Sequence, residues 1–269
     1  MKACAKERIC FVAALAVLGW AQGTVQAADW ATEISNANPL NWFRFEDLSG
    51  TVADDQGSAN MDGTYVGNVV LGNPGLVGRA AAFDAGGHVF LGRANLATGW
   101  TLETIFKADT VNGGVSMGLV GTDFAAAADR MAIKAEQWDS TGQMGYTLFG
   151  VVDVTFAGSL AATPADFAHV VFVGQNSGVS LYVNGVLAGS DATSTALARW
   201  ALATGAIRAD GTLVDPLTGM IDELVIYDRA LSVDEISAHF ATVPEPTVLS
   251  LGVLAGLALL GGRLGARRR

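Results

Sequence analysis

Short segments rich in β-branched and aromatic residues recur along the middle of the chain, separated by Gly, Asn and Asp. One of them, WTLETIFKA at residues 100–108, places Leu102, Thr104 and Phe106 on one face and the odd-numbered residues of 103–107 on the other. A period of two is typical of a β-strand. The regular spacing of such segments predicts an all-β domain, either a sandwich or a jelly roll.

Two local signals are sharper than the rest. Asn184-Gly185 separates the apolar segments SLYV and VLAGS, and both residues tolerate the positive φ of a type I′ turn, so we expect a β-hairpin there. Ser232 followed by Glu235 matches a capping box, and apolar residues one turn apart within 236–240 continue the pattern. The sequence therefore predicts a short helix that closes the domain.

The N-terminus has the pattern of a secretory signal peptide. Basic residues within 2–8 precede an apolar run at 9–21, and small residues surround Ala27. We expect residues 1–27 to be removed, so that the mature chain begins at Ala28. Because both cysteines of the chain lie in the removed segment, the mature protein is expected to have neither a disulfide nor thiol chemistry.

The C-terminus combines an apolar run with a cluster of arginines. Residues 248–262 carry no charge, and a helix over about 247–263 would be a short membrane span, since fifteen helical residues cover roughly 22 Å of a hydrocarbon core of about 30 Å. The positive-inside rule would keep the arginines on the cytoplasmic side and the domain on the other. These arginines include Arg267, Arg268 and Arg269.

Charge and composition exclude several functions for the domain between these termini. The chain has a formal net charge of −10 although both ends are basic, and it lacks the basic stripe with interleaved aromatics that a nucleic-acid groove needs. Its three histidines are far apart in sequence, which argues against a zinc site. The adjacent acids Asp222 and Glu223 are expected on opposite faces of a strand, so they should not act together on a glycosidic bond. We therefore expect no enzymatic activity.

Four segments in order carry a family resemblance: LNWFRFEDLSGTVADDQGSANMDGTY, LVGRAAAFDAGGHVFLG, FAHVVFVGQNSGVSLYVNGVLAGS and GMIDELVIYDRALSVDEI. They resemble the signatures of concanavalin A-like, laminin G-like jelly-roll domains of bacteria. The resemblance covers roughly residues 38–240 and implies an all-β, two-sheet antiparallel jelly-roll sandwich, so we assign residues 28–242 to one such domain. Where the family usually carries a Trp-His or His-His pair this chain has Ala168-His169, so His169 is expected to be a packed strand residue.

The same resemblance implies a structural Ca²⁺ held by the aspartate of the closing strand. Here that residue is Asp222, and hard oxygen ligands from loops are what calcium prefers. The loop ADDQGSANMDG offers further oxygen atoms, although aspartate and asparagine also cap turns, which is the alternative explanation. The loop candidates are Asp54, Asp55, Asn60 and Asp62.

The tail resembles the PEP-CTERM sorting segment of exopolysaccharide-producing Gram-negative bacteria. Pro244, Glu245 and Pro246 form its Pro-Glu-Pro core, and the apolar run and arginines of residues 243–269 follow in the expected order. The resemblance implies recognition by an exosortase, an enzyme of the membrane, so that the domain would reside at the cell envelope or outer surface, or be released after cleavage.

Exposed aromatic side chains are the usual means by which such domains stack on sugars. Trp138 and Trp200 lie among polar or turn residues, so we expect them on loops and take them as the candidate ligand contacts. Trp42 and Trp100 lie inside strand patterns and are expected in the core. The sequence thus predicts an exported, non-enzymatic binding protein for carbohydrate or exopolysaccharide. The alternatives are a structural or adhesive matrix protein without a discrete ligand site and a polysaccharide-degrading enzyme.

Overall fold

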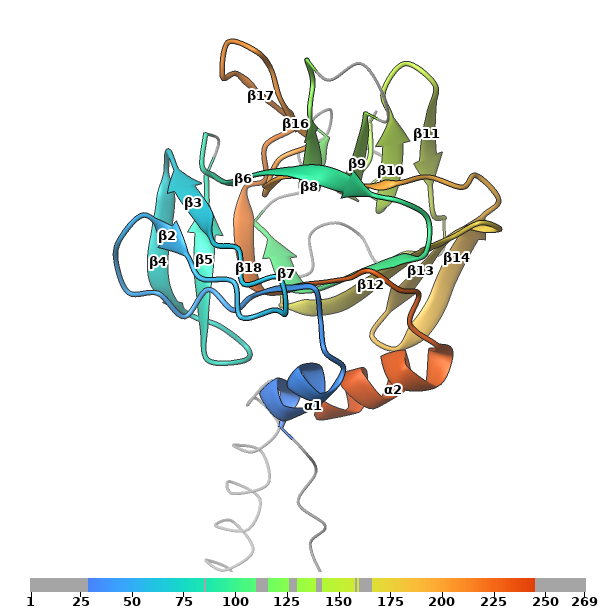
Figure 1. The fold of residues 1–269 in the computed structure, drawn as a ribbon, viewed down its shortest axis with the longest axis horizontal. Helices are drawn as coiled ribbons and strands as arrows, with labels where there is room; N and C mark the ends of the chain where they lie inside the picture. Colours follow the sequence, from blue (N-terminus) through green and yellow to red (C-terminus); the bar gives the residue numbers. More distant parts are fainter. Residues whose placement is uncertain are drawn as a thin grey trace, which may run out of the picture.

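The computed structural model describes residues 29–84, 86–109, 116–125, 130–138, 142–157, 159 and 166–244. The predicted signal peptide at 1–27 and the tail from Glu245, including the predicted membrane helix, lie outside this part of the chain. Within it, no helix is long and apolar enough to cross a membrane. Figure 1 shows two layers of strands, with two helices packed side by side against one layer.

The first sheet, which we call sheet A, has eight strands among the described residues, in the order β14-β13-β12-β7-β18-β5-β4 with β1 added beside β18. All of its strand pairs are antiparallel. Its strands are β1 Asn41–Phe43, β4 Val69–Pro74, β5 Arg79–Phe83, β7 Trp100–Ala108, β12 Ala168–Gln175, β13 Gly178–Val183, β14 Val186–Asp191 and β18 Gly219–Tyr227.

The second sheet, sheet B, follows the order β11-β10-β9-β8-β15-β6-β3-β2, with the small hairpin β16–β17 attached to β8. The pairing of β16 with β8 is parallel, and the others are antiparallel. Its strands are β2 Val52–Ala53, β3 Gly63–Val66, β6 His88–Leu96, β8 Met117–Asp123, β9 Met131–Glu136, β10 Gly145–Leu148, β11 Val152–Thr155, β15 Leu197–Leu202, β16 Ala206–Ile207 and β17 Leu213–Val214.

Two hydrophobic clusters divide the interior. The larger fills the space between the sheets and includes Leu102, Phe106 and Trp100, which confirms the predicted core position of Trp100. The smaller lies between sheet A and the helices and includes Ile105 and Trp42. Both faces of β7 are therefore buried, which explains why its alternation in sequence is imperfectly polar.

The predicted C-terminal helix is confirmed as α2, Val233–Thr242, with Ser232 as N-cap and a complete capping box with Glu235. Ile236 is fully buried as expected, but Phe240 remains 37% exposed. The first helix, α1, covers Trp30–Asn36 and was not predicted. Its signal in the sequence is Asp29, whose side chain caps the helix by accepting a hydrogen bond from the Thr32 N–H.

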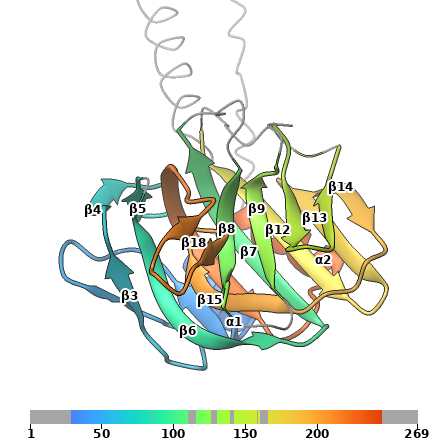
Figure 2. The same cartoon turned by 90° about the horizontal axis from the view of Figure 1, so that it is seen from above.

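The predicted hairpin is also confirmed. β13 and β14 pair antiparallel around Asn184 and Gly185, whose φ angles of 48° and 75° are those that a type I′ turn requires. The view from above in Figure 2 shows these strands at one end of the molecule, beside β12. The two-sheet antiparallel sandwich expected from the sequence is the observed architecture.

Candidate functional site

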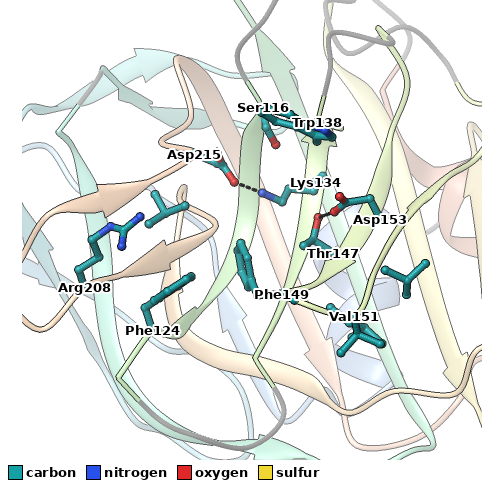
Figure 3. A pocket seen from close by; sticks show the side chains of 14 residues that line it. Ser116, Phe124, Lys134, Trp138, Thr147, Phe149, Val151, Asp153, Arg208 and Asp215 are labelled. Atoms are coloured by element: carbon teal, nitrogen blue, oxygen red, sulfur yellow. Dashed lines mark hydrogen bonds and ion pairs between the residues drawn. The ribbon is translucent and has the colours of Figure 1, made fainter.

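A cleft of about 540 Å³ lies on the outer face of sheet B, the face turned away from the sandwich core. On β9, Met131, Ile133 and Ala135 point into the core, so the alternate residue Lys134 points outward and forms the floor of the cleft. Thr147 of the neighbouring strand β10 also lines it. Figure 3 shows these side chains between the β16–β17 hairpin on one side and the β10–β11 hairpin on the other.

The β16–β17 hairpin forms a wall of the cleft because glycines let it cross β8 closely. A Cβ atom on Gly118 would lie 2.2 Å from the backbone nitrogen of Gly205, and one on Gly121 would lie 2.4 Å from the Gly205 carbonyl carbon. No side chain fits at such distances, so both glycines are needed for the crossing. Backbone hydrogen bonds fix it, including those from the Gly118 N–H to the Asp215 carbonyl and from the Phe124 N–H to the Ile207 carbonyl.

Lys134 and Asp215 form an ion pair at the floor of the cleft (Figure 3). The lysine is almost completely buried, whereas the carboxylate side chain is one quarter exposed. Burial lowers the pKa of Lys134 because it disfavours the charged ammonium, and the charge and hydrogen bond of Asp215 oppose that change only in part. The pair therefore presents a carboxylate oxygen to the cleft while its cation stays beneath.

Aromatic rings also line the cleft. Phe124 and Phe149 meet edge to face with ring centroids 5.2 Å apart, and the Lys134 ammonium lies 5.3 Å from the Phe149 centroid. Trp138, two residues after the end of β9, lines the same cleft with 63% of its surface exposed. Beside the rings, the Thr147 hydroxyl donates to Asp153 Oδ1 at 2.7 Å. Apolar faces next to a few polar groups are the usual composition of a small-molecule site.

The two tryptophans predicted as ligand contacts occupy different places. Trp138 lies in the cleft, whereas Trp200 lies within β15 rather than on a loop, so its predicted loop position is wrong. Trp200 is partly buried and packs edge to face against Phe90, with ring centroids 5.5 Å apart. Arg199 is the one polar residue beside it, whereas Leu197, Ala198, Ala201 and Leu202 are fully buried, so the surrounding sequence is that of a packed strand.

The predicted calcium ligand Asp222 is fully buried at the turn between β4 and β5. Its Oδ2 atom accepts hydrogen bonds from the Leu76 and Val77 N–H groups at 2.5 and 2.7 Å, while Oδ1 has no hydrogen-bond partner among the described residues. Burial raises the pKa of this carboxyl to about 7, although the two N–H groups oppose the change. An unsatisfied hard oxygen fits a cation, so Asp222 is suited to the predicted role.

The loop residues predicted as further ligands are used differently. Asp55 is buried and accepts hydrogen bonds from Asn41 Nδ2, Trp42 N, Gly57 N and Met61 N. Its carboxylate thus fixes the conformation of the loop and joins it to β1. Asp62 accepts from the Asp55 N–H, Asp54 from Gln56, and Asn60 adopts a φ of 47°. In the part of the chain that the structure describes, no three acidic, His or Cys side chains are grouped to hold a metal. The alternative of turn formation describes this loop better than metal binding.

The expectation that Asp222 and Glu223 face opposite ways is wrong. The register of β18 against β7 shifts between Ile221 and Glu223, a β-bulge, while Ile221 and Leu224 both point into the core between the sheets. Both carboxyl groups therefore lie on the outer side of sheet A. Glu223 accepts from Trp42 Nε1 at 2.6 Å, and burial raises its pKa to about 8.

Two of the three histidines, distant in sequence, meet at one buried carboxylate. Glu103 on β7 lies 2.7 Å from His169 Nε2 and 2.9 Å from His239 Nδ1, and it accepts from the Tyr227 hydroxyl at 3.1 Å. His169 is buried, as predicted for a packed strand residue, and the ring of Trp30 packs edge to face against it. We call the four hydrogen-bonded residues Glu103, His169, Tyr227 and His239 the Glu103 cluster. It joins α2 to sheet A, and periodicity in the sequence gave no sign of it.

Two packed antiparallel sheets, with a cleft on the outer face of one, define a concanavalin A-like jelly-roll protein. Residues 83–237 match a laminin G family model described as the concanavalin A-like lectin/glucanases superfamily, and the chain belongs to that family. A comparison with curated protein sequences finds no match.

Solved structures share the fold at low sequence identity. Domain 4 of AbnA, a GH43 extracellular arabinanase from Geobacillus stearothermophilus in complex with arabinotriose, is 19% identical with a TM-score of 0.58, over 75% of this chain and 98% of that one. A Trypanosoma rangeli sialidase mutant with trans-sialidase activity is 18% identical with a TM-score of 0.53, over 78% of this chain and 34% of the sialidase. The binding domain of Paraclostridial Mosquitocidal Protein 1 is 14% identical with a TM-score of 0.52, over 76% and 52%. These similarities show the fold.

Proposed function

We propose that the protein is an exported, non-enzymatic binding protein that holds a carbohydrate polymer in the cleft on sheet B. The observation that carries this proposal is the combination of Trp138, Phe124 and Phe149 with the Lys134–Asp215 pair in one cleft. Aromatic faces stack on the C–H faces of sugar rings, and the adjacent carboxylate and hydroxyl groups hydrogen-bond to sugar hydroxyls. The arabinotriose complex of the AbnA domain, a protein of the same fold, lends further support.

A binding role is favoured over hydrolysis by the contacts of the carboxylates in the cleft. Asp215 is paired with Lys134, and Asp153 accepts a hydrogen bond from Thr147, so each has a partner within the fold. A glycosidase needs two carboxyl groups that are both available to one glycosidic bond. Neither of these two carboxylates meets that need.

The experiment is isothermal titration of the protein with a panel of polysaccharides, comparing Trp138→Ala and Phe149→Ala with the parent. Each substitution removes stacking area and should weaken binding by about 1 to 3 kcal/mol, or roughly 5- to 150-fold in Kd. Phe240→Ala, which truncates a partly exposed aromatic on α2 outside the cleft, is the control and should bind as the parent does. If no polysaccharide binds, the alternative of a structural or adhesive matrix protein replaces this proposal.

We also propose that Asp222 holds a structural Ca²⁺ through its unsatisfied Oδ1 atom. Burial disfavours the negative charge of Asp222, and a bound cation would offset that cost. The cation would also stabilise the turn between β4 and β5, whose N–H groups donate hydrogen bonds to Asp222. Melting with and without calcium tests this, because a ligand of the folded state raises the melting temperature.

The route to the cell surface is a proposal too. The predicted signal peptide at 1–27 would direct export, and the Pro-Glu-Pro segment with its membrane helix would present the chain to an exosortase. Pro244 is exposed and follows the C-cap of α2, Val243, so the segment begins at the surface of the folded domain, where an enzyme can reach it. The protein would then remain at the cell envelope or outer surface of a Gram-negative bacterium, or be released.

A further inference from the structure

Two arginine side chains lie over the same phenylalanine at the edge of the cleft. The guanidinium carbon of Arg208 is 4.8 Å from the Phe124 ring centroid, and that of Arg130 is 5.1 Å from it. Arg208 comes from the turn between β16 and β17, whereas Arg130 immediately precedes β9. Figure 3 shows Arg208 and Phe124 together on the hairpin side of the cleft. Stacking of this kind restricts the Arg208 guanidinium while its N–H groups stay able to donate.

The two arginines line two adjoining cavities. Arg208 lines the cleft of about 540 Å³, and Arg130 lines a second cavity of about 490 Å³. Leu148, Phe149 and Val151 belong to the lining of both, so the cavities meet at the start of the β10–β11 hairpin. A polymer chain that enters the cleft could therefore continue past Phe149 into the second cavity.

The guanidinium of Arg208 forms no ion pair with the described residues. The residue is exposed. The acids around it have other partners: Asp215 pairs with Lys134, Asp123 accepts from the Ala125 N–H, and Asp210 accepts from the Thr212 N–H. The chain has a net charge of −10, which repels anions in general, so an exposed cation beside a sugar-sized cleft would favour an anionic ligand at that place.

We infer that the ligand of the cleft is an acidic polysaccharide, with a carboxylate or sulfate group bound by Arg208. This inference rests on the proposed carbohydrate binding and narrows it to one chemical class. A planar carboxylate suits the arginine best, because the guanidinium fork donates two parallel hydrogen bonds to its two oxygens.

The test compares each acidic polymer with a neutral polymer of the same backbone. Polygalacturonate and alginate are titrated beside their carboxyl-reduced forms, and dextran sulfate beside dextran, which separates carboxylate from sulfate recognition. We expect an acidic member to bind about tenfold more tightly than its neutral counterpart, because charge-assisted hydrogen bonds are about twice as strong as neutral ones. Raising the ionic strength should reduce this preference.

Arg208→Gln should abolish the preference for the acidic polymer, and Arg208→Lys should restore only part of it, since lysine keeps the charge but loses the fork. Arg79→Gln, an exposed arginine at the start of β5 in sheet A, is the matched control and should leave the preference intact. Equal binding of acidic and neutral forms, or equal behaviour of the Arg208 and Arg79 variants, overturns the inference but leaves carbohydrate binding standing. Absence of binding to every polymer overturns both.

Discussion

Replacing Glu103 by Gln tests whether the Glu103 cluster is a buried ion pair that holds α2 on the sheet. Burial by itself raises the pKa of Glu103, but the hydrogen bonds and charges of His169 and His239 outweigh it and lower the pKa from 4.5 to about 2. Burial lowers the pKa of His239, but Glu103 again outweighs it, and the net shift is upward. The folded state therefore favours a carboxylate beside an imidazolium.

The size of the effect follows from these shifts. A change from 4.5 to about 2 corresponds to roughly 3 kcal/mol at about 1.4 kcal/mol per pKa unit, and removing one partner of a buried pair typically costs about 3 to 5 kcal/mol. The lowered carboxyl pKa stabilises the fold above about pH 4.5, and this contribution is lost as the pH falls toward 2. The raised imidazole pKa stabilises it below about pH 6.5, and this contribution is lost as the pH rises through the folded pKa.

The stability difference between parent and Glu103→Gln should therefore be greatest between about pH 4.5 and 6.5 and should shrink on both sides. Urea unfolding at a series of pH values measures it, and about 3 kcal/mol would lower Tm by roughly 6 to 12 °C in a domain of this size. Asp234→Asn, which removes an exposed carboxylate from the same helix, is the control and should change stability by less than about 1 kcal/mol. Parallel pH profiles for parent and Glu103→Gln would refute a charged cluster.

Three further predictions concern other parts of the molecule. EDTA should lower the melting temperature of the parent but not of Asp222→Asn, and identical melts of the parent with and without chelator would exclude the proposed calcium. Gly118→Ala should destabilise the fold by about 1 to 3 kcal/mol and weaken glycan binding, because its Cβ displaces the hairpin at Gly205; unchanged binding would contradict this. Replacing Pro244, Glu245 and Pro246 by alanine should leave the chain unprocessed in the membrane, as fractionation of cells would show.

The sequence determined the features that depend on neighbouring residues. Asn184 and Gly185 tolerate positive φ angles in any fold, so the hairpin followed from local chemistry. The side chains of Ser232 and Glu235 accept hydrogen bonds from the free N–H groups at a helix N-terminus, so α2 followed in the same way. Alternation in β7 was equally local, and four ordered motifs were enough to indicate the jelly-roll family. Trp138 could be recognised as an exposed aromatic because polar and turn residues surround it.

Tertiary structure decided the chemistry of the interior and of the cleft. Lys134 and Asp215 are separated by 81 positions, and Glu103 and His239 by 136, so only the order of strands in the sheets and the return of α2 bring each pair together. The bulge at Asp222 depends on the register of β18 against β7, a relation between strands that a pattern within one strand does not contain. Periodicity reports which face a side chain occupies, whereas the partner on that face is set by packing across the fold.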